Sequence, residues 1–231
     1  MTRKSARSAV VAVAAMTGLA AAVAVAPAAV EAASHPAART PAAKAKVVNL
    51  IKDSGAESAK PDSDGGKVTV PGWKPAKGSQ FTAVAYGAAG GFPASTSPGP
   101  KHRGKSFFAG GPSGNTSGAS QSDSLKADAK LIASGQAKFQ LSGWLGGFSS
   151  QSDSATLTVT WRTAKGKALG HTTIGPVTPT QRHDVTGMLH RTKSGTVPKG
   201  AAQAVVTLHM VRRDGAYIDG YADNLSLTIT R

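Results

Sequence analysis

The stretch ATLTVTWRT, residues 155–163, decides the fold class. Its apolar residues are Leu157, Val159 and Trp161, and threonine fills the alternate positions 156, 158 and 160. A period of two is that of a β-strand with one face in a core. We therefore expect Trp161 to be a core residue and the threonines to form a ladder on the opposite face.

Short β-prone runs flank this stretch and are separated by clusters of Gly, Ser and Pro. They are VTV at Val68, FTAVAY at Phe81, SFFAGG at Ser106, AKFQLSGW at Ala137, QAVVTLHMVRR at Gln203 and NLSLTIT at Asn224. One segment, DSLKADAKLIAS from Asp123, has helical spacing and predicts a helix of two or three turns. The pentapeptide SQSDS occurs at Ser120 and at Ser150; one such pair does not establish a repeat, and two loops of common composition explain it about as well. The sequence predicts an all-β protein with one short helix.

Composition limits the chemistry of the 231-residue chain. It has no cysteine, which excludes disulfides, thiolate zinc sites and a cysteine nucleophile. Hydrophobic residues make up 40% of the chain, and 27 Gly with 13 Pro indicate many turns. Disorder throughout is therefore excluded, and the chain can form one substantial core.

The first residues have the pattern of an export signal. Arg3, Lys4 and Arg7 precede an apolar run over residues 9–26, and small residues follow it. We predict a signal peptide at 1–33, a linker at 34–46 and a folded domain at 47–231. The alternative is a permanent membrane anchor. No later segment predicts stable membrane insertion, so we expect a secreted protein, extracellular or associated with the cell envelope.

The chain is strongly basic, with 27 Lys and Arg against 12 Asp and Glu and a net charge of +15. Positive charge on an exported protein favours binding to anionic envelope polymers. The cations are scattered, however, so the alternative is that they serve solubility alone. The sequence has no nucleic-acid-binding module, and we expect no nucleic-acid partner.

Two ends of the expected domain resemble a known family. NLIKDSGAES at Asn49 and AYIDGYADNLSLTIT at Ala216 resemble the opening turn and last strand of galactose-binding-like domains. FFAGG at Phe107 and GWLGGFSSQSD at Gly143 are similar to a secreted bacterial subgroup. The resemblance implies an antiparallel β-sandwich of jelly-roll type, as in many carbohydrate-binding modules, with a glycan partner and no catalysis.

The resemblance also implies a structural calcium ion near the first and last strands, with Glu57 and Asp223 at the matching positions. Independently, Asp223 is in phase with the apolar residues Leu225 and Leu227, which predicts a carboxylate that points into the core. Such a carboxylate needs a cation or hydrogen-bond donors. Calcium is one hypothesis, and pairing with N–H groups or an arginine is the other.

A sugar site needs an aromatic plane and fixed polar groups. In AKFQLSGW the apolar phase is Phe139 and Leu141, so Trp144 should face outward unless a bulge at Gly143 shifts the register. Trp144 is therefore the predicted stacking platform for a sugar ring.

Polar candidates follow Trp144 and precede the last strand. They are Gln151, Asp153, Arg213, Asp219 and Tyr221, and the resemblance implies that the loop after Trp144 and the hairpin before the last strand are neighbours. The alternative is structural: Trp144 caps the core edge, Asp153 caps a turn and Arg213 pairs with Asp219.

Enzymatic motifs are missing from the sequence. It has neither a G-x-S-x-G elbow nor an H-E-x-x-H helix, and Asp153, Asp219 and Asp223 form the one carboxylate cluster that could serve glycoside hydrolysis. We therefore predict a secreted, non-catalytic carbohydrate- or envelope-binding module. The alternatives are a basic structural or adhesive envelope protein that binds anionic polymers without a sugar pocket and, third, a glycan hydrolase.

Overall fold

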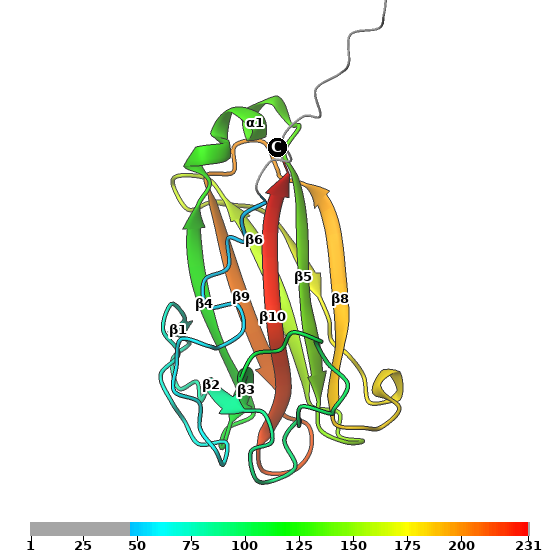
Figure 1. The fold of residues 1–231 in the computed structure, drawn as a ribbon. Coiled ribbons are helices and arrows are strands. Elements are labelled where there is room, and N and C mark those ends of the chain that lie inside the picture. Colours follow the sequence, from blue (N-terminus) through cyan, green and yellow to red (C-terminus); the bar gives the residue numbers. More distant parts are fainter. Residues whose placement is uncertain (1–46, 231) are drawn as a thin grey trace, which may run out of the picture. The chain divides into compact units, whose positions relative to one another are not determined.

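Residues 47–230 are described by a computed structural model and form a sandwich of two antiparallel five-stranded sheets (Figure 1). The first sheet, in spatial order, comprises β1 (Lys74–Pro75), β4 (Thr116–Ser124), β9 (Gln203–Val211), β6 (Ser154–Arg162) and β7 (Ala168–Ile174). The second sheet comprises β2 (Thr82–Ala85), β3 (Ser106–Gly111), β10 (Ile218–Thr230), β5 (Lys138–Gly147) and β8 (Gly187–Thr196). The predicted all-β, jelly-roll sandwich is confirmed. The predicted signal peptide and linker lie outside the described residues.

Within residues 47–230, helical structure is confined to short segments. A 3₁₀ turn at Lys126–Asp128 continues into α1 (Ala129–Ser134), and a second 3₁₀ turn spans Thr180–Arg182. The helix predicted from Asp123 is therefore present, although it is shorter than its spacing suggested. None of the helices in residues 47–230 is both long and apolar enough to span a membrane.

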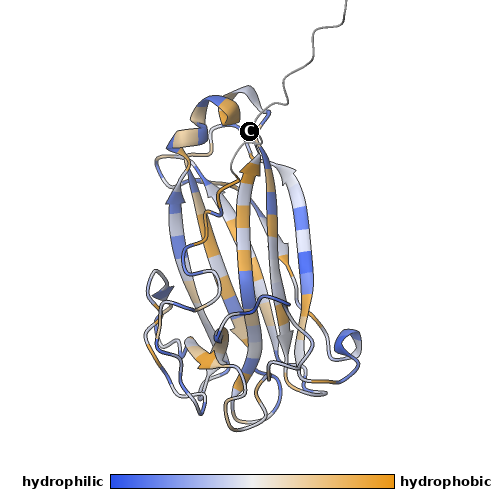
Figure 2. Cartoon of the chain, in the orientation of Figure 1, coloured by the Kyte–Doolittle hydropathy of each residue, from blue (hydrophilic) through white to orange (hydrophobic). Residues whose placement is uncertain are grey.

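The main core lies between the two sheets. Leu157 and Val159 are fully buried and Trp161 is 2% exposed, while the threonines between them are only half-buried on the outer face. The same alternation of hydrophobic and hydrophilic residues runs along the neighbouring strands in Figure 2. The predicted core position of Trp161 is confirmed. Burial of each large apolar side chain contributes about 1.5–3 kcal/mol to folding.

A second, smaller cluster lies on the outer face of the second sheet. It comprises Val84, Phe92, Phe107, Ala109, Met188 and Tyr221. Phe92 comes from the segment 86–105, which joins β2 to β3 and crosses in front of β10 and β5 in Figure 1. This segment covers one half of the outer face and leaves the other half open.

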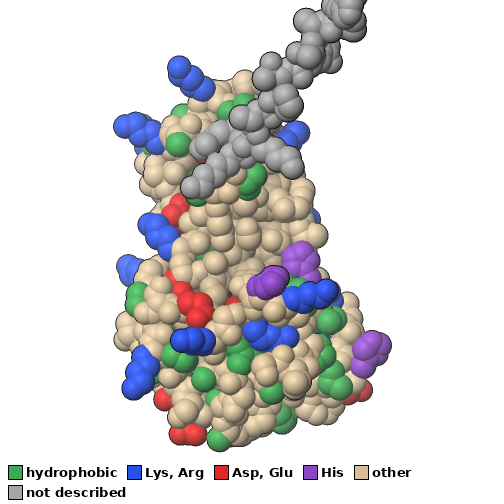
Figure 3. All heavy atoms as spheres, viewed as in Figure 1, with side chains coloured by type: hydrophobic (Ala, Val, Ile, Leu, Met, Phe, Trp, Pro, Cys, Tyr) green, Lys and Arg blue, Asp and Glu red, His purple; other side chains and the backbone are tan. Residues whose placement is uncertain are grey.

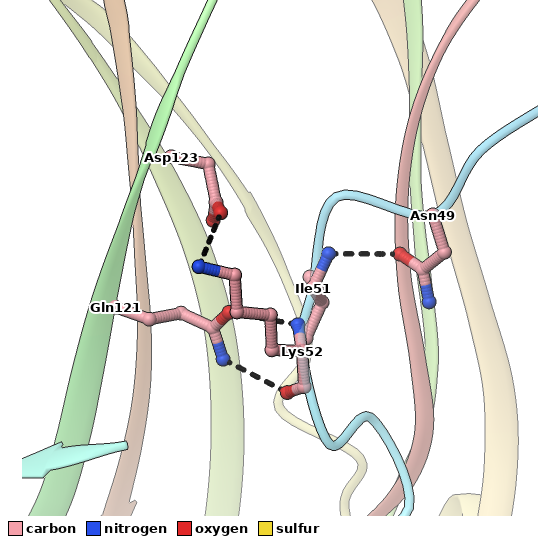
Figure 4. Close-up of polar contacts among 5 residues, drawn as sticks. All are labelled: Asn49, Ile51, Lys52, Gln121 and Asp123. Carbon is pink, nitrogen blue, oxygen red and sulfur yellow. Dashed lines mark hydrogen bonds and ion pairs between the residues drawn. The ribbon is translucent and has the colours of Figure 1, made fainter. Parts of the chain in front are cut away.

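The N-terminal segment of the domain ties the two sheets together (Figure 4). The Asn49 amide donates to the carbonyl of Leu225 in β10, and its Oδ1 accepts from the Leu227 amide. Three residues later, the Lys52 backbone N–H and C=O pair with the Gln121 side chain in β4. Lys52 also forms an ion pair with Asp123 at 3.7 Å, but Lys52 is 71% exposed, so this pair contributes little.

A β-bulge in β10 overturns one prediction. The pairing of β10 with β5 shifts register between Asp223 and Ser226, and Asn224 adopts a positive φ of 46°. One extra residue reverses the alternation, so Asp223 lies opposite Trp144 on the outer face and not in the phase of Leu225. The expected core-facing direction of Asp223 is therefore wrong. The carboxylate is nevertheless fully buried.

Candidate functional site

Trp144 lies on the outer face of the second sheet, between its covered and open halves. In β5, Phe139 and Leu141 are buried toward the core, whereas Trp144 is half-buried on the other side. Gly143 keeps the core-facing phase, so β5 has no bulge there and the predicted outward direction is confirmed. One side of the indole packs against the second cluster, and its ring centroid lies 5.6 Å from that of His190.

Beyond Trp144, the open half of the face is covered by hydroxyl and amide groups from three adjacent strands. Strand pairing places them in rows: Ser142 with Thr192 and Ser226, Gln140 with Ser194 and Thr228, and Lys138 with Thr196 and Thr230. In Figure 3 this surface is largely free of hydrophobic and charged side chains and is bordered below by histidine, lysine and arginine. We call Trp144, His190 and these rows the polar platform. Sequence reasoning missed the rows because β8 was not predicted.

Asp153 joins two loops and does not face solvent. It is fully buried, and its carboxylate accepts hydrogen bonds from the backbone N–H groups of Arg213 (2.5 Å), Asp214 (2.9 Å) and Asp219 (2.8 Å). The loop 148–153 and the hairpin 212–219 are therefore neighbours, as the resemblance implied. With both oxygens engaged, Asp153 acts here as the structural alternative describes, as a cap for a turn.

Asp219 and Tyr221 form a buried pair beneath the surface. The Tyr221 hydroxyl donates to the Asp219 carboxylate at 2.5 Å, and Tyr221 is fully buried. Burial raises the pKa of Asp219, and the charge of Asp153 raises it further, against the lowering effect of the Tyr221 hydrogen bond. Asp219 reaches one small hollow of about 230 Å³, which Phe92 and Phe148 also line. Neither residue lies on the polar platform.

The remaining two polar candidates also lie away from Trp144. Gln151 is half-buried beside Gly215, and its Oε1 is a buried atom with no hydrogen-bond partner in residues 47–230. Arg213 is exposed. It does not form the ion pair with Asp219 that the structural alternative expected, because the ion pair found in residues 47–230 joins Lys52 to Asp123. The structure therefore brings Asp153, Asp219, Tyr221 and the backbone of Arg213 together, but apart from the open surface beside Trp144.

Arg182 is a buried cation that sequence reasoning missed. It is 2% exposed, and its guanidinium donates to the carbonyls of Ser149 (2.7 Å), Val185 (2.5 Å) and Gln151 (3.1 Å). These contacts fix the loop that follows β5. The local sequence TQRHD is polar throughout, so no pattern distinguishes Arg182 from a surface arginine.

The two predicted calcium ligands lie close to each other. The Glu57 carboxylate accepts from the backbone N–H groups of Lys105 and Ser106, both at 2.9 Å. Asp223 accepts from the Tyr86 hydroxyl at 2.7 Å and from the Asn224 N–H at 2.6 Å. Both side chains flank Gly55.

These hydrogen bonds to Glu57 and Asp223 are of the kind that the alternative hypothesis expects, in which no metal ion is needed to compensate the two carboxylates. Residues 47–230 contain no cluster of three or more acidic, histidine or cysteine side chains placed for a metal ion. A calcium ion takes six to eight oxygens, so here it would depend mainly on backbone carbonyls and water. Calcium at Glu57 and Asp223 is therefore a proposal to be tested by its effect on stability.

The burial of Asp223 predicts a pH-dependent stability. Burial raises its pKa to about 7, against the lowering effects of the hydrogen bonds from Tyr86 and Asn224. A carboxyl that binds its proton more tightly in the folded state stabilises the fold fully below its usual pKa of 3.8, and this contribution is lost as the pH rises through about 7. The difference between the usual pKa and the pKa in the folded state corresponds to at most about 4 kcal/mol in the free energy of unfolding.

In a chelator, we expect the melting temperature to fall between about pH 4 and 7, and Asp223→Asn to flatten this fall. The same scan with millimolar calcium tests the metal, because a bound cation would favour the ionised carboxylate and restore stability at the higher pH. An equal pH profile in wild type and Asp223→Asn contradicts the prediction. A melting temperature indifferent to calcium at every pH contradicts the calcium proposal alone.

Comparison with known proteins identifies the fold and no family. No family model and no curated protein match this chain. Among solved structures, the Stig cyclase Fisc from Fischerella sp. TAU aligns with a TM-score of 0.52 at 13% identity, over 80% of this chain and 98% of the cyclase. A family 16 carbohydrate-binding module aligns with a TM-score of 0.47 at 20% identity, over 78% of this chain and 99% of the module.

The enzymatically active domain of bacteriophage CBA120 tailspike protein 4 gives a TM-score of 0.47 at 14% identity, over 79% of this chain. This chain spans only 21% of that tailspike chain. At such identities the likeness shows the β-sandwich fold alone.

Proposed function

We propose that the chain is a secreted, non-catalytic carbohydrate-binding module that holds a glycan on the polar platform. The position of Trp144 is the observation that carries this proposal. A half-buried indole borders a sheet face of hydroxyl and amide groups. Such a plane can stack on the apolar face of a pyranose ring, and its packing against the second cluster holds it in place before the ligand binds.

The rows beside Trp144 supply partners for sugar hydroxyls. Hydroxyl side chains such as those of Ser142 and Thr192 both donate and accept hydrogen bonds. The Gln140 side chain donates through its NH₂ group and accepts through its carbonyl oxygen. The rows bear no charge until Lys138 at their far end, and its ammonium donates to Thr196 at 2.6 Å. This chemistry favours a neutral glycan of a cell wall or another extracellular polysaccharide.

The state of the carboxylates supports a non-catalytic role. Glycoside hydrolysis needs two carboxyl groups that reach the substrate. Asp153, Asp219 and Asp223 are buried, and each accepts hydrogen bonds from backbone N–H groups or a tyrosine hydroxyl. Asp223 lies opposite Trp144 on the same face, but it is fully buried, and Asp153 and Asp219 are buried away from the polar platform. We therefore favour reversible binding over a hydrolase.

Trp144→Ala is expected to weaken retention on neutral polysaccharide by at least about tenfold, because it removes the stacking plane. The measurement is a pulldown of the mature protein on cellulose, xylan, galactan and isolated cell walls at about 0.15 M salt. Trp144→Phe should keep part of the affinity. Thr160→Ala, on the outer face of the first sheet, is the matched control and should bind as wild type.

Salt separates this proposal from a basic adhesive protein. Stacking in a fixed site persists at high ionic strength, whereas charge-driven binding is screened. The proposal would be overturned if Trp144→Ala left retention unchanged while about 0.5 M salt abolished it. The polar platform would then not be a glycan site, and an electrostatic envelope protein would be favoured.

A further inference from the structure

A groove crosses the outer face of the first sheet, on the side of the sandwich opposite to the polar platform. Its volume is about 720 Å³, and its lining includes Lys74, Lys77, Asn115, Ser120, Thr207 and His209. Lys74, Lys77 and His209 are exposed. We call this feature the basic groove.

Strand pairing explains why a hollow forms there. Lys74, Ser120 and Thr207 lie in one row across β1, β4 and β9. In the adjacent row, His209 lies opposite Gly118, which has no side chain and leaves the floor as bare backbone. A Cβ atom at Gly118 would come within 2.5 Å of the Leu208 carbonyl oxygen, so the position is restricted to glycine and the hollow is built into the sheet.

The basic groove continues into a second hollow of about 570 Å³. The two share Asn115 and Thr116, and the second adds Arg212 and Arg213. The Arg212 guanidinium donates to the Asn115 side chain at 2.7 Å, which fixes both groups at the junction. An elongated ligand could therefore contact cations along both hollows.

The cations that line the two hollows form no ion pair within the described residues, where the ion pair found joins Lys52 to Asp123. Residues 47–230 contain 20 Lys and Arg against 11 Asp and Glu, a net charge of +9. Most of the carboxylates are committed to local hydrogen bonds with backbone N–H groups or tyrosine hydroxyls: Asp53, Glu57, Asp62, Asp153, Asp214, Asp219 and Asp223. Among the described residues, no carboxylate lines the larger hollow. In the smaller one, Asp214 accepts from the Ser152 N–H.

The lining selects a class of ligand. Cations line the groove together with hydroxyl and amide groups, and no tryptophan, tyrosine or phenylalanine lines either hollow within the described chain. Single-stranded nucleic acid is usually held by aromatic stacking as well as charge, and a neutral sugar would lack partners for the cations. We propose that the basic groove binds an acidic polysaccharide, with its acid groups on Lys74, Lys77 and Arg213 and its hydroxyls on Asn115, Ser120 and Thr207.

The test is a charge reversal inside the groove against an equal reversal outside it. Lys74→Glu combined with Lys77→Glu is expected to weaken binding to polygalacturonate by at least about tenfold at low salt. The control is Lys165→Glu combined with Lys167→Glu, two exposed residues in the turn between β6 and β7. It changes the net charge equally and should weaken binding less than about threefold. Melting curves establish that each variant folds.

Three results would overturn the inference. Equal loss in both double variants would assign the binding to diffuse charge, and no loss in either would place it elsewhere. If single-stranded DNA bound more tightly than polygalacturonate and was equally sensitive to the Lys74 and Lys77 substitutions, the ligand class would be nucleic acid and not acidic polysaccharide. Trp144→Ala should leave polygalacturonate binding unchanged, so a failure of the polar platform and a failure of the basic groove are distinguishable.

Discussion

Asp153→Ala is expected to lower the free energy of unfolding by about 3–5 kcal/mol. The carboxylate is fully buried and accepts hydrogen bonds from three backbone N–H groups, those of Arg213 and Asp214 before β10 and that of Asp219 at its start. Alanine would leave these donors buried without partners, and each unsatisfied group costs about 1–3 kcal/mol. Urea unfolding followed by tryptophan fluorescence measures the change.

Two variants make the Asp153 result specific. Asp153→Asn keeps one acceptor oxygen but turns an NH₂ group toward a backbone donor, so we expect an intermediate loss. Asp64→Ala removes the same charge from an exposed position and should change stability by no more than about 0.5 kcal/mol. Equal stability of Asp153→Ala and Asp64→Ala would show that the two loops are held by other contacts.

Arg182→Met is expected to lower the free energy of unfolding by about 3 kcal/mol, although methionine fills much of the same space. Its guanidinium satisfies three carbonyls in the segments 149–151 and 185, and methionine offers them no donor. The loss should appear in urea unfolding and also in faster amide hydrogen exchange of the loop after β5.

Arg182→Lys separates charge from geometry. A single ammonium cannot reproduce the planar fork of donors, so we expect it to recover only part of the stability. Arg162→Met, at an exposed position, is the matched control. If Arg182→Met were as stable as wild type, apolar filling of the site would be sufficient and the three hydrogen bonds would make no net contribution.

Periodicity predicted the strands that bury one face. β6, β9 and β10 alternate apolar and polar residues over most of their length, and their core positions are buried as expected. β4, β7 and β8 were missed because they lack a clear alternation of apolar and polar residues and are rich in glycine, serine or threonine. VTV at Val68, by contrast, is not a strand. The SQSDS at Ser120 lies within β4, whereas the copy at Ser150 begins in a loop. The conformation of this pentapeptide therefore depends on whether a neighbouring strand pairs with it, and not on its composition.

The candidate site was predicted only in part for similar reasons. The phase of Trp144 followed from its own strand, but the platform beside it is supplied by β8 and β10, and pairing between distant strands is not visible in local sequence. The bulge after Asp223 needed the observed positive φ at Asn224. A buried Asp that caps backbone groups, such as Asp153, and an exposed Asp that binds a sugar look the same in sequence.

The place of β10 has a consequence for how the chain acquires its fold. The last strand in sequence lies between β3 and β5 in the second sheet, and these two strands have no pairing with each other. Asn49 then docks onto β10 across a separation of 176 residues. Nearly the whole domain must therefore leave the ribosome before this sheet can close, so folding of the second sheet is expected to be slow. A nascent chain that ends before residue 218 would have two open strand edges, which makes truncated products prone to aggregation.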